Sequence, residues 1–406
     1  MVTLQLEVVA AVINASQENS TLKSRKSSGL IALSATALAL PGISLSDAPP
    51  TQSSAFYKIS NYSEDDLERS ESPFGDLERY DIDVHQFRLI SPIGRNFSFS
   101  LDANHETMSG ASPWYTSSDS NGDPIVALSG ASGIYDERSE VSFSTSYYLN
   151  QGTVSGTAGY SEENDYRAIY YALGGSRNFN SELTTLSFGY SYSSDEIFPT
   201  DAALFNRVKH ERKNSKSGVV SVSQIISQNS TYQVSLSISE QSGFLSDPYK
   251  LKDVRPSSKT QIAFTNSFRH FLQKNNAAVH VNYRYYHDDF GISSHTIDSS
   301  WHQNIGRSFR VVPNIRYYTQ SAANFFTNID DFTKPNNEYQ SSDYRLSAFG
   351  ALSGGIDLVF NYGRWSTILS AERYVANDSF AGYAVNRPSA SLVKFNRFSI
   401  GFEYIF

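Results

Sequence analysis

The 406-residue chain contains no cysteine, no long apolar run and no excess of basic charge. Without cysteine there are no disulfides, thiolate metal sites or cysteine nucleophiles. A helical membrane protein is excluded as well, because each span needs about 20 consecutive apolar residues. The net charge of -8 offers no basic stripe of the kind that phosphate backbones require, so we expect no nucleic-acid partner.

The chain is instead rich in aromatic residues and in strand-like alternation. It contains 26 Tyr and 26 Phe, and only 18% of its residues are charged. In many segments every second residue is apolar, which is the period of a β-strand whose two faces differ. No long segment has a helical period, so the pattern predicts an all-β fold. Clear examples are residues 97–103, 141–149, 186–192, 232–238 and 279–285.

Three further features place the apolar face against lipid rather than in a protein core. The alternating segments run for about 10 to 14 residues, which suits a tilted bilayer span. Tyrosine pairs such as Tyr147-Tyr148 and Tyr317-Tyr318 stand at strand ends, where amphipathic rings suit the headgroup level. The connections alternate between short and long. We therefore predict a transmembrane antiparallel up-and-down β-barrel in contact with the lipid of the bacterial outer membrane.

Counting from a first strand at Ser54–Tyr62 to a last strand at Leu392–Phe406 gives about 16 strands. This count reads Ser341–Tyr362 as one long strand, with Gly350, Gly354 and Gly355 at a β-bulge. Three short turns share a Gly-Arg pair, at 93–97, 305–309 and 362–365, and we expect a positive φ at each glycine.

The two ends of the chain carry recognisable signals. Lys23, Arg25 and Lys26 precede an apolar stretch and small residues near Ser46, so we expect a signal peptide at 1–46 and a single barrel domain at 47–406. The last strand places Phe402, Tyr404 and Phe406 on one face. This pattern is similar to the signal that the barrel-insertion machinery reads, so that machinery is an expected partner.

Several blocks of the chain resemble one bacterial family, catalogued as domain of unknown function 3570. The resemblance covers roughly Tyr57 to Phe406 and implies an outer-membrane barrel, with no agreed activity and no established catalytic residues. The blocks that carry it, in order, are Ser109-Gly-Ala-Ser-Pro-Trp-Tyr115, Gly243-Phe-Leu-Ser-Asp-Pro-Tyr249, Ser294-His-Thr296, Arg316-Tyr-Tyr-Thr-Gln320 and Ser342-Asp-Tyr-Arg-Leu-Ser-Ala-Phe349.

Polar residues between the apolar positions of neighbouring strands are candidates for the barrel interior. There they form either a selectivity wall or a set of ion pairs that fixes strand register. The candidate pore-lining residues are His280, Asn282, Arg284, Asp298, His302, Arg310, Asn314, Arg316, Asp343 and Arg345. The eight histidines lack metal-ligand spacing, so we expect no metal and no cofactor.

Aromatic residues in two long loops are candidates for ligand binding: Trp114, Tyr115, Phe325 and Phe326. They could stack on sugars, fold into the lumen as a plug, or staple a loop to the rim. Ser294 and His295 are adjacent, so on a strand they point to opposite faces and cannot form a catalytic dyad together. We expect no enzyme activity.

The leading interpretation is a porin-like conduit for small polar solutes. The first alternative is a closed structural or assembly barrel that docks a periplasmic or other envelope protein. The second is a hydrolase whose site lies at the barrel rim. Composition and pattern leave the solute, the partner and the state of the lumen open.

Overall fold

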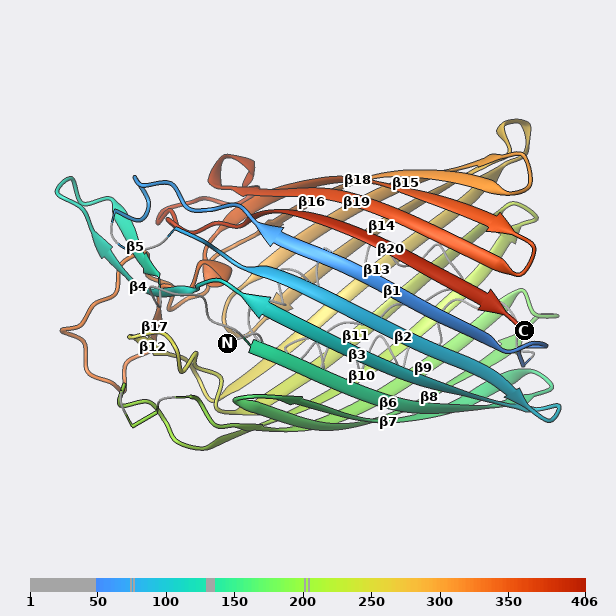
Figure 1. Cartoon of the computed structure of the whole chain (residues 1–406), viewed down its shortest axis with the longest axis horizontal. Helices are drawn as coiled ribbons and strands as arrows, with labels where there is room; N and C mark the ends of the chain where they lie inside the picture. The colour runs from blue at the N-terminus through green and yellow to red at the C-terminus, as the bar shows by residue number, and fades with distance from the viewer. Residues whose placement is uncertain (1–48, 74, 76, 129–135, 201, 204) are drawn as a thin grey trace.

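The fold is a closed barrel of sixteen antiparallel strands, seen in a computed structural model (Figure 1). The structure describes residues 49–73, 75, 77–128, 136–200, 202–203 and 205–406. The predicted signal peptide at 1–46 lies outside the described residues. No helix in the described part of the chain is long and apolar enough to cross a membrane.

The barrel strands follow the chain order around the ring, and the first pairs with the last. The predicted count of sixteen is confirmed. The strands are β1 Ser54–Glu64, β2 Asp81–Ile93, β3 Phe97–Ser109, β6 Asp136–Leu149, β7 Gly152–Glu163, β8 Tyr166–Phe179, β9 Thr184–Ile197, β10 Glu211–Ser227, β11 Ser230–Gly243, β13 Ser258–Leu272, β14 Ala277–Asp288, β15 Ser293–Ile305, β16 Phe309–Gln320, β18 Phe349–Tyr362, β19 Trp365–Asn377 and β20 Lys394–Ile405.

Small elements occupy the connections. Two small sheets of two strands each pair β4 Pro113–Ser118 with β5 Pro124–Leu128, as a hairpin, and β12 Asp253–Val254 with β17 Gln340–Ser341, from two different loops. Three 3-10 helices are η2 Gln273–Asn275, η3 Tyr344–Leu346 and η4 Asp378–Phe380.

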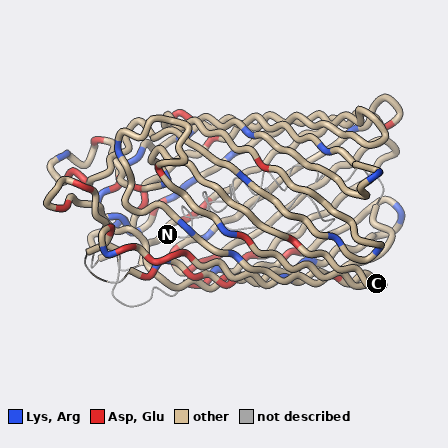
Figure 2. The backbone as a smooth tube through the Cα atoms, turned by 90° about the horizontal axis from the view of Figure 1, so that it is seen from above, with Lys and Arg blue, Asp and Glu red and all other residues tan. Residues whose placement is uncertain are grey.

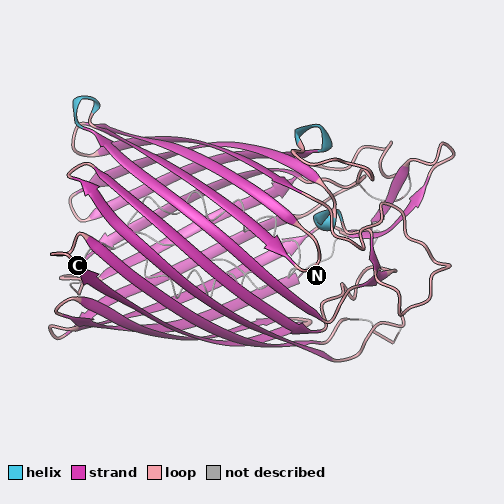
Figure 3. Cartoon of the chain, turned by 180° about the vertical axis from the view of Figure 1, so that it is seen from behind, coloured by secondary structure: helices cyan, strands magenta, loops and turns pink. Residues whose placement is uncertain are grey.

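Alternation along each strand gives the wall two chemically different faces. On the outer face large apolar side chains are exposed, for example Val281, Ile297 and Ile315 on three neighbouring strands. Their polar neighbours Thr296, His302 and Arg316 are buried on the opposite, inner face. Figure 3 shows the strands from behind, all tilted across the wall. Such tilt and a lipid-facing apolar surface are what a barrel needs to cross a bilayer.

The two ends of the barrel differ in their connections. At one end, which we call the short-turn end, the strands are joined by tight turns, and Ser53 and Phe406 exchange two backbone hydrogen bonds (Figure 1). Gly94, Gly306 and Gly363 in the Gly-Arg turns have φ between 59° and 64°, as predicted. The other end, the long-loop end, carries β4, β5, β12 and β17. In outer-membrane barrels the short turns are periplasmic.

The prediction of one long strand at Ser341–Tyr362 is wrong. The chain leaves β17 at Ser341, forms η3 at Tyr344–Leu346 and enters the barrel only at Phe349. The predicted bulge at Gly350, Gly354 and Gly355 is also absent, because β18 pairs with β16 and β19 in unbroken register. Asp343 bonds Arg255 of another loop, and the Tyr344 ring packs among residues of the barrel strands, so the segment forms no strand ladder of its own.

Candidate functional site: the inner wall and the loop cover

Strands β14, β15 and β16 bring most of the predicted pore-lining residues onto one stretch of inner wall. The register places Asn282 opposite Asp298, and Asp298 opposite Arg316. The Asn282 Nδ2 group donates to Asp298 Oδ1 at 2.7 Å. Asp298 thus lies between the Asn282 amide and Arg316, and these polar and charged groups share the inner face.

Two histidines stack one row closer to the short-turn end. The rings of His280 and His302 lie 4.2 Å apart, and His302 Nε2 and Ser300 Oγ are 2.9 Å apart. Pairing between β15 and β16 is interrupted beside them, between Ser300↔Asn314 and Gln303↔Val311. The interruption lies at Pro313, which has no N–H to donate to the ladder. The prediction that these histidines share a face agrees with their contact.

The remaining strand candidates also lie on this wall. The Arg284 guanidinium packs 5.8 Å from the centre of the Tyr286 ring, and Arg310 Nε donates to Asn304 Oδ1 at 2.8 Å. Asn314 lies opposite Gly355, where the missing side chain leaves room for its amide, since a β-carbon there would lie 3.0 Å from Asn314 Oδ1. The three side chains thus belong to one inner surface.

Asp343 and Arg345 do not belong to this wall, which corrects their prediction as pore-lining strand residues. They lie in and beside η3, buried among loops at the long-loop end. Arg345 Nε donates to Asp343 Oδ1 at 2.7 Å, and Arg255 Nη2 donates to Asp343 Oδ2 at 2.7 Å. Burial alone would raise the pKa of Asp343, but the two guanidiniums outweigh burial and hold it far below its usual range.

Three long loops interlock at this end, and we call residues 110–128, 244–257 and 321–348 the loop cover. They leave the ring after its third, ninth and thirteenth strands, so none starts beside another. They nevertheless bond to one another: Leu251 N donates to Trp114 O at 2.9 Å, Thr116 N donates to Asp330 Oδ2 at 2.8 Å, and Asp253 pairs with Ser341. Loops rooted so far apart can meet only across the barrel mouth.

The predicted loop aromatics pack within this cover. Phe326 is buried with Phe290, Ile292 and Leu346, and the Phe325 ring lies 5.0 Å from Phe290 in an edge-on contact. These contacts pack the loop of Phe325 and Phe326 against the turn between β14 and β15. Trp114 and Tyr115 are partly exposed and lie 5.5 Å apart, with Tyr115 against Phe332.

Sequence reasoning missed a charged cluster on the inner face near the long-loop end. Arg138 lies 3.3 Å from Glu106 and 3.6 Å from Glu163, and it also bonds Glu140. Tyr170 OH donates to Glu140 Oε1 at 2.6 Å. The signal in the sequence was Asp136, Arg138 and Glu140 alternating on β6 before the apolar face begins at Val141.

One group of carboxylates has spacing that a metal ion could use. Oxygen atoms of Asp136, Glu163 and Asp165 lie within 4.8 Å of one another, the only such group among the described residues. Tyr249 OH donates to Asp165, and Asn164 Nδ2 donates to Asp136 Oδ1 at 2.7 Å. These contacts, with the Arg138 pair of Glu163, describe an ion-pair network that joins strand ends to a loop.

The last strand and the Ser294-His295 pair complete the predicted sites. The Tyr404 ring lies 4.6 Å from the Trp365 ring in a tilted contact and stacks on Phe406 at 6.1 Å, and Phe402 is exposed on the outer face. His295 lies 2.8 Å from the Tyr283 hydroxyl on the outer face, whereas Ser294 is buried. The serine and histidine therefore point apart, as predicted.

The closed wall of tilted strands, apolar outside and polar inside, defines the chain as an outer-membrane-type β-barrel. Within this class a family model described as protein of unknown function (DUF3570) matches residues 30–386. The chain belongs to this family, which confirms the resemblance of its motifs. No curated protein matches it.

Solved structures with similar barrels have little sequence in common with the chain. The siderophore receptor PirA from Pseudomonas aeruginosa is 14% identical, with 87% of this chain and 62% of that chain covered and a TM-score of 0.43. A bacterial polysaccharide outer membrane secretin is 9% identical, with 87% and 98% covered and a TM-score of 0.48. CdiB from Acinetobacter baumannii is 9% identical, with 87% and 60% covered and a TM-score of 0.49. The chain thus spans less than two thirds of PirA and of CdiB.

Proposed function

We propose that this protein is a conduit for small polar solutes whose outer mouth is closed by the loop cover. The observation that carries the proposal is the polar inner wall of β14–β16, which runs behind an interlocked set of loops. Barrels of this strand number in porins leave room for an aqueous channel. A row of Asp, Arg, Asn and His side chains can coordinate hydrated solutes in such a channel.

Gating follows from how the cover is held. Arg255 and Arg345 share the Asp343 carboxylate, and Arg345 Nη2 also lies 3.4 Å from Asp247 Oδ2. Lys252 Nζ adds a bond to Lys334 O at 2.9 Å. Buried ion pairs of this kind are costly to break one partner at a time, so the cover moves as a unit. A solute or a partner that competes for these charges would open the mouth.

Planar-bilayer recording tests the conduit. The purified protein is compared with a variant in which residues 113–128, the β4–β5 hairpin, are replaced by a short Gly-Ser linker. We expect rare openings of the native protein and frequent openings of the variant. A folded variant, checked by its heat-modifiable migration, that conducts no current would overturn the proposal.

The interlocked cover also favours a second function, that of a closed structural barrel which docks an envelope protein. The two functions separate in the same experiment. A silent bilayer from the folded hairpin variant favours the closed barrel, because removing the cover then leaves no path. Steady conductance from that variant favours the conduit.

A further inference from the structure

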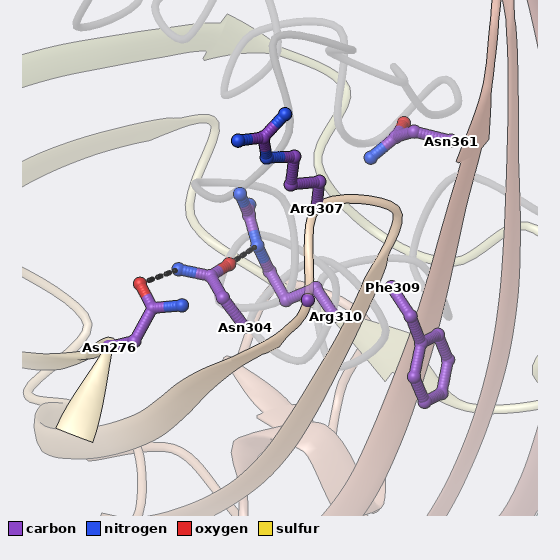
Figure 4. Close-up of a pocket in the computed structure, with 7 residues that line it drawn as sticks. Asn276, Asn304, Arg307, Phe309, Arg310 and Asn361 are labelled. Atoms are coloured by element: carbon purple, nitrogen blue, oxygen red, sulfur yellow. Dashed lines mark hydrogen bonds between the residues drawn. The ribbon is translucent and has the colours of Figure 1, made fainter.

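A polar cavity of about 260 Å³ lies at the short-turn end of the barrel (Figure 4). Two arginines and three asparagines line it: Arg307, Arg310, Asn276, Asn304 and Asn361. Figure 4 shows Arg307 and Arg310 reaching to the same side of the turn, whereas the ring of Phe309 points away. The cavity therefore gathers hydrogen-bond donors from three neighbouring connections and strand ends.

The backbone positions both guanidiniums. Gly306, at φ 64°, makes the tight turn that carries Arg307 at its tip, and Arg310 follows one residue into β16. Arg310 Nε donates to Asn304 Oδ1 at 2.8 Å, and Asn304 Nδ2 donates to Asn276 Oδ1 at 3.4 Å. These two hydrogen bonds fix the Arg310 guanidinium through its Nε group, and Arg310 lines the cavity.

The charge of the cavity is not neutralised by the part of the chain that the structure describes. Among those residues neither Arg307 nor Arg310 forms an ion pair. The wall above adds further polar side chains, since His280 stacks on His302. Two guanidiniums that share a cavity without a carboxylate repel each other, and an anion between them relieves that repulsion.

We propose that this cavity binds a small oxyanion, a phosphate or a carboxylate, at the periplasmic mouth of the barrel. Guanidinium forks match the oxygens of both groups in bidentate geometry, and amide donors complete the set. The cavity volume suits a compact anion rather than an extended ligand. This inference deepens the proposed conduit by naming its solute class, but the binding itself requires no conduction.

Direct binding to the purified full-length protein, folded in detergent, is the test. Equilibrium dialysis with radiolabelled inorganic phosphate forms one arm and dialysis with radiolabelled citrate the other. The test variant is Arg307→Gln with Arg310→Gln. Its matched control, Arg95→Gln with Arg364→Gln, removes equal charge from the two other Gly-Arg turns, whose arginines do not line the cavity.

We expect saturable binding in at least one arm, weakened roughly tenfold or more in the test variant and unchanged in the control. The arm that saturates tells a phosphate site from a carboxylate site. No saturable binding in either arm, or equal losses in both variants, would overturn the proposal. Binding by a protein that never conducts in bilayers would reject the conduit and leave the anion site standing.

Discussion

The arginines at the two ends of the barrel have different partners: carboxylates at the long-loop end and amides at the short-turn end. At the long-loop end Arg79 pairs with Glu64 at 2.8 Å, Arg138 lies among three glutamates, and Arg255 and Arg345 share Asp343. At the short-turn end Arg307 and Arg310 have amide neighbours instead. Figure 2 shows the same contrast along the whole molecule, with Asp and Glu gathered toward the long-loop end.

This difference separates two uses of charge. The buried ion pairs at the long-loop end neutralise each other. They can therefore hold loops together, but they leave little net charge to attract a solute. The guanidiniums of Arg307 and Arg310 at the short-turn end have no carboxylate partner among the described residues. The wall between the two ends connects them through one polar face. Four substitutions test this comparison.

The largest effect is expected for Asp343→Asn in the loop cover. It leaves Arg255 and Arg345 side by side without their shared carboxylate, which we expect to lower the free energy of opening the cover by about 3–5 kcal/mol. Trp114 reports the opening by fluorescence in urea when Trp301 and Trp365 are replaced by Phe. The control is Arg212→Gln, whose exposed pair with Glu196 is worth about 0–1 kcal/mol.

If Asp343→Asn and Arg212→Gln lowered the free energy of opening equally, the buried ion pairs would not hold the loop cover more strongly than an exposed surface pair does. Acid provides a second check. The folded pKa of Asp343 is lowered, so its stabilising contribution is present above the unfolded value of about 3.9 and is lost only as the pH falls below it. The cover should therefore stay closed from pH 7 down to about 5.

The next effect concerns the wall that joins the two ends. Ile315, in the middle of β16, is 61% exposed on the outer face. We expect Ile315→Lys to destabilise the barrel by about 2–4 kcal/mol, because a lysine at the bilayer midplane loses its hydration. Asn314→Lys, one residue away on the inner face, should be tolerated. Chemical denaturation in lipid vesicles gives both values, and equal losses would show that no polar inner face connects the ends.

A smaller effect tests the close packing of a long loop on the barrel. A β-carbon on Gly350 would lie 2.0 Å from the Phe380 carbonyl oxygen, whereas one on Gly354 would lie 3.9 Å from its nearest neighbour, Asn314 O. We expect Gly350→Ala to destabilise the protein by about 1–3 kcal/mol through overpacking. Gly354→Ala should be neutral in the same denaturation assay. A neutral Gly350→Ala would mean that the η4 loop does not dock there.

The smallest effect is a pH dependence at η4, outside the strands. Burial raises the pKa of Asp378 to about 6. Because the folded value lies above the unfolded value of about 3.9, the folded loop gains stability as the pH falls through 6 and gains no more below 3.9. Asp378→Asn should abolish this change. Hydrogen exchange of the backbone amides of residues 377–381 at pH 7 and pH 5 measures it, and an unchanged difference in the variant would reject the assignment.

Most of the barrel could be predicted from the sequence, because a strand that faces lipid on one side must alternate. The turns at Gly94, Gly306 and Gly363 were predictable for a similar reason, since tight turns of that form need a positive φ. The segment Ser342–Phe349 also alternates, but it does not form a strand. Tyr344, Leu346 and Ala348 alternate with polar residues as in a strand. The local pattern therefore predicts a strand where the structure has a loop and η3.

The partners of that segment lie far away in the chain. Asp343 bonds Arg255 across 88 positions and Arg345 bonds Asp247 across 98. A local pattern carries no information on such contacts. The cavity at the short-turn end could not be predicted for the same reason, because Arg307 lies in one turn and Asn276 belongs to another connection.

The sequence by itself determined the number of strands, which face of each strand meets lipid, and which end carries the short turns. The lipid-facing side follows from a period of two, which each segment shows independently of every other, whereas the count and the short-turn end follow from the number of segments and the lengths of their connections. Only the tertiary structure decided that the loops meet across the mouth, that Asp343 and Arg345 hold them, and that two arginines share a cavity at the other end. Ring closure brings these residues together, and it is a property of all sixteen strands at once.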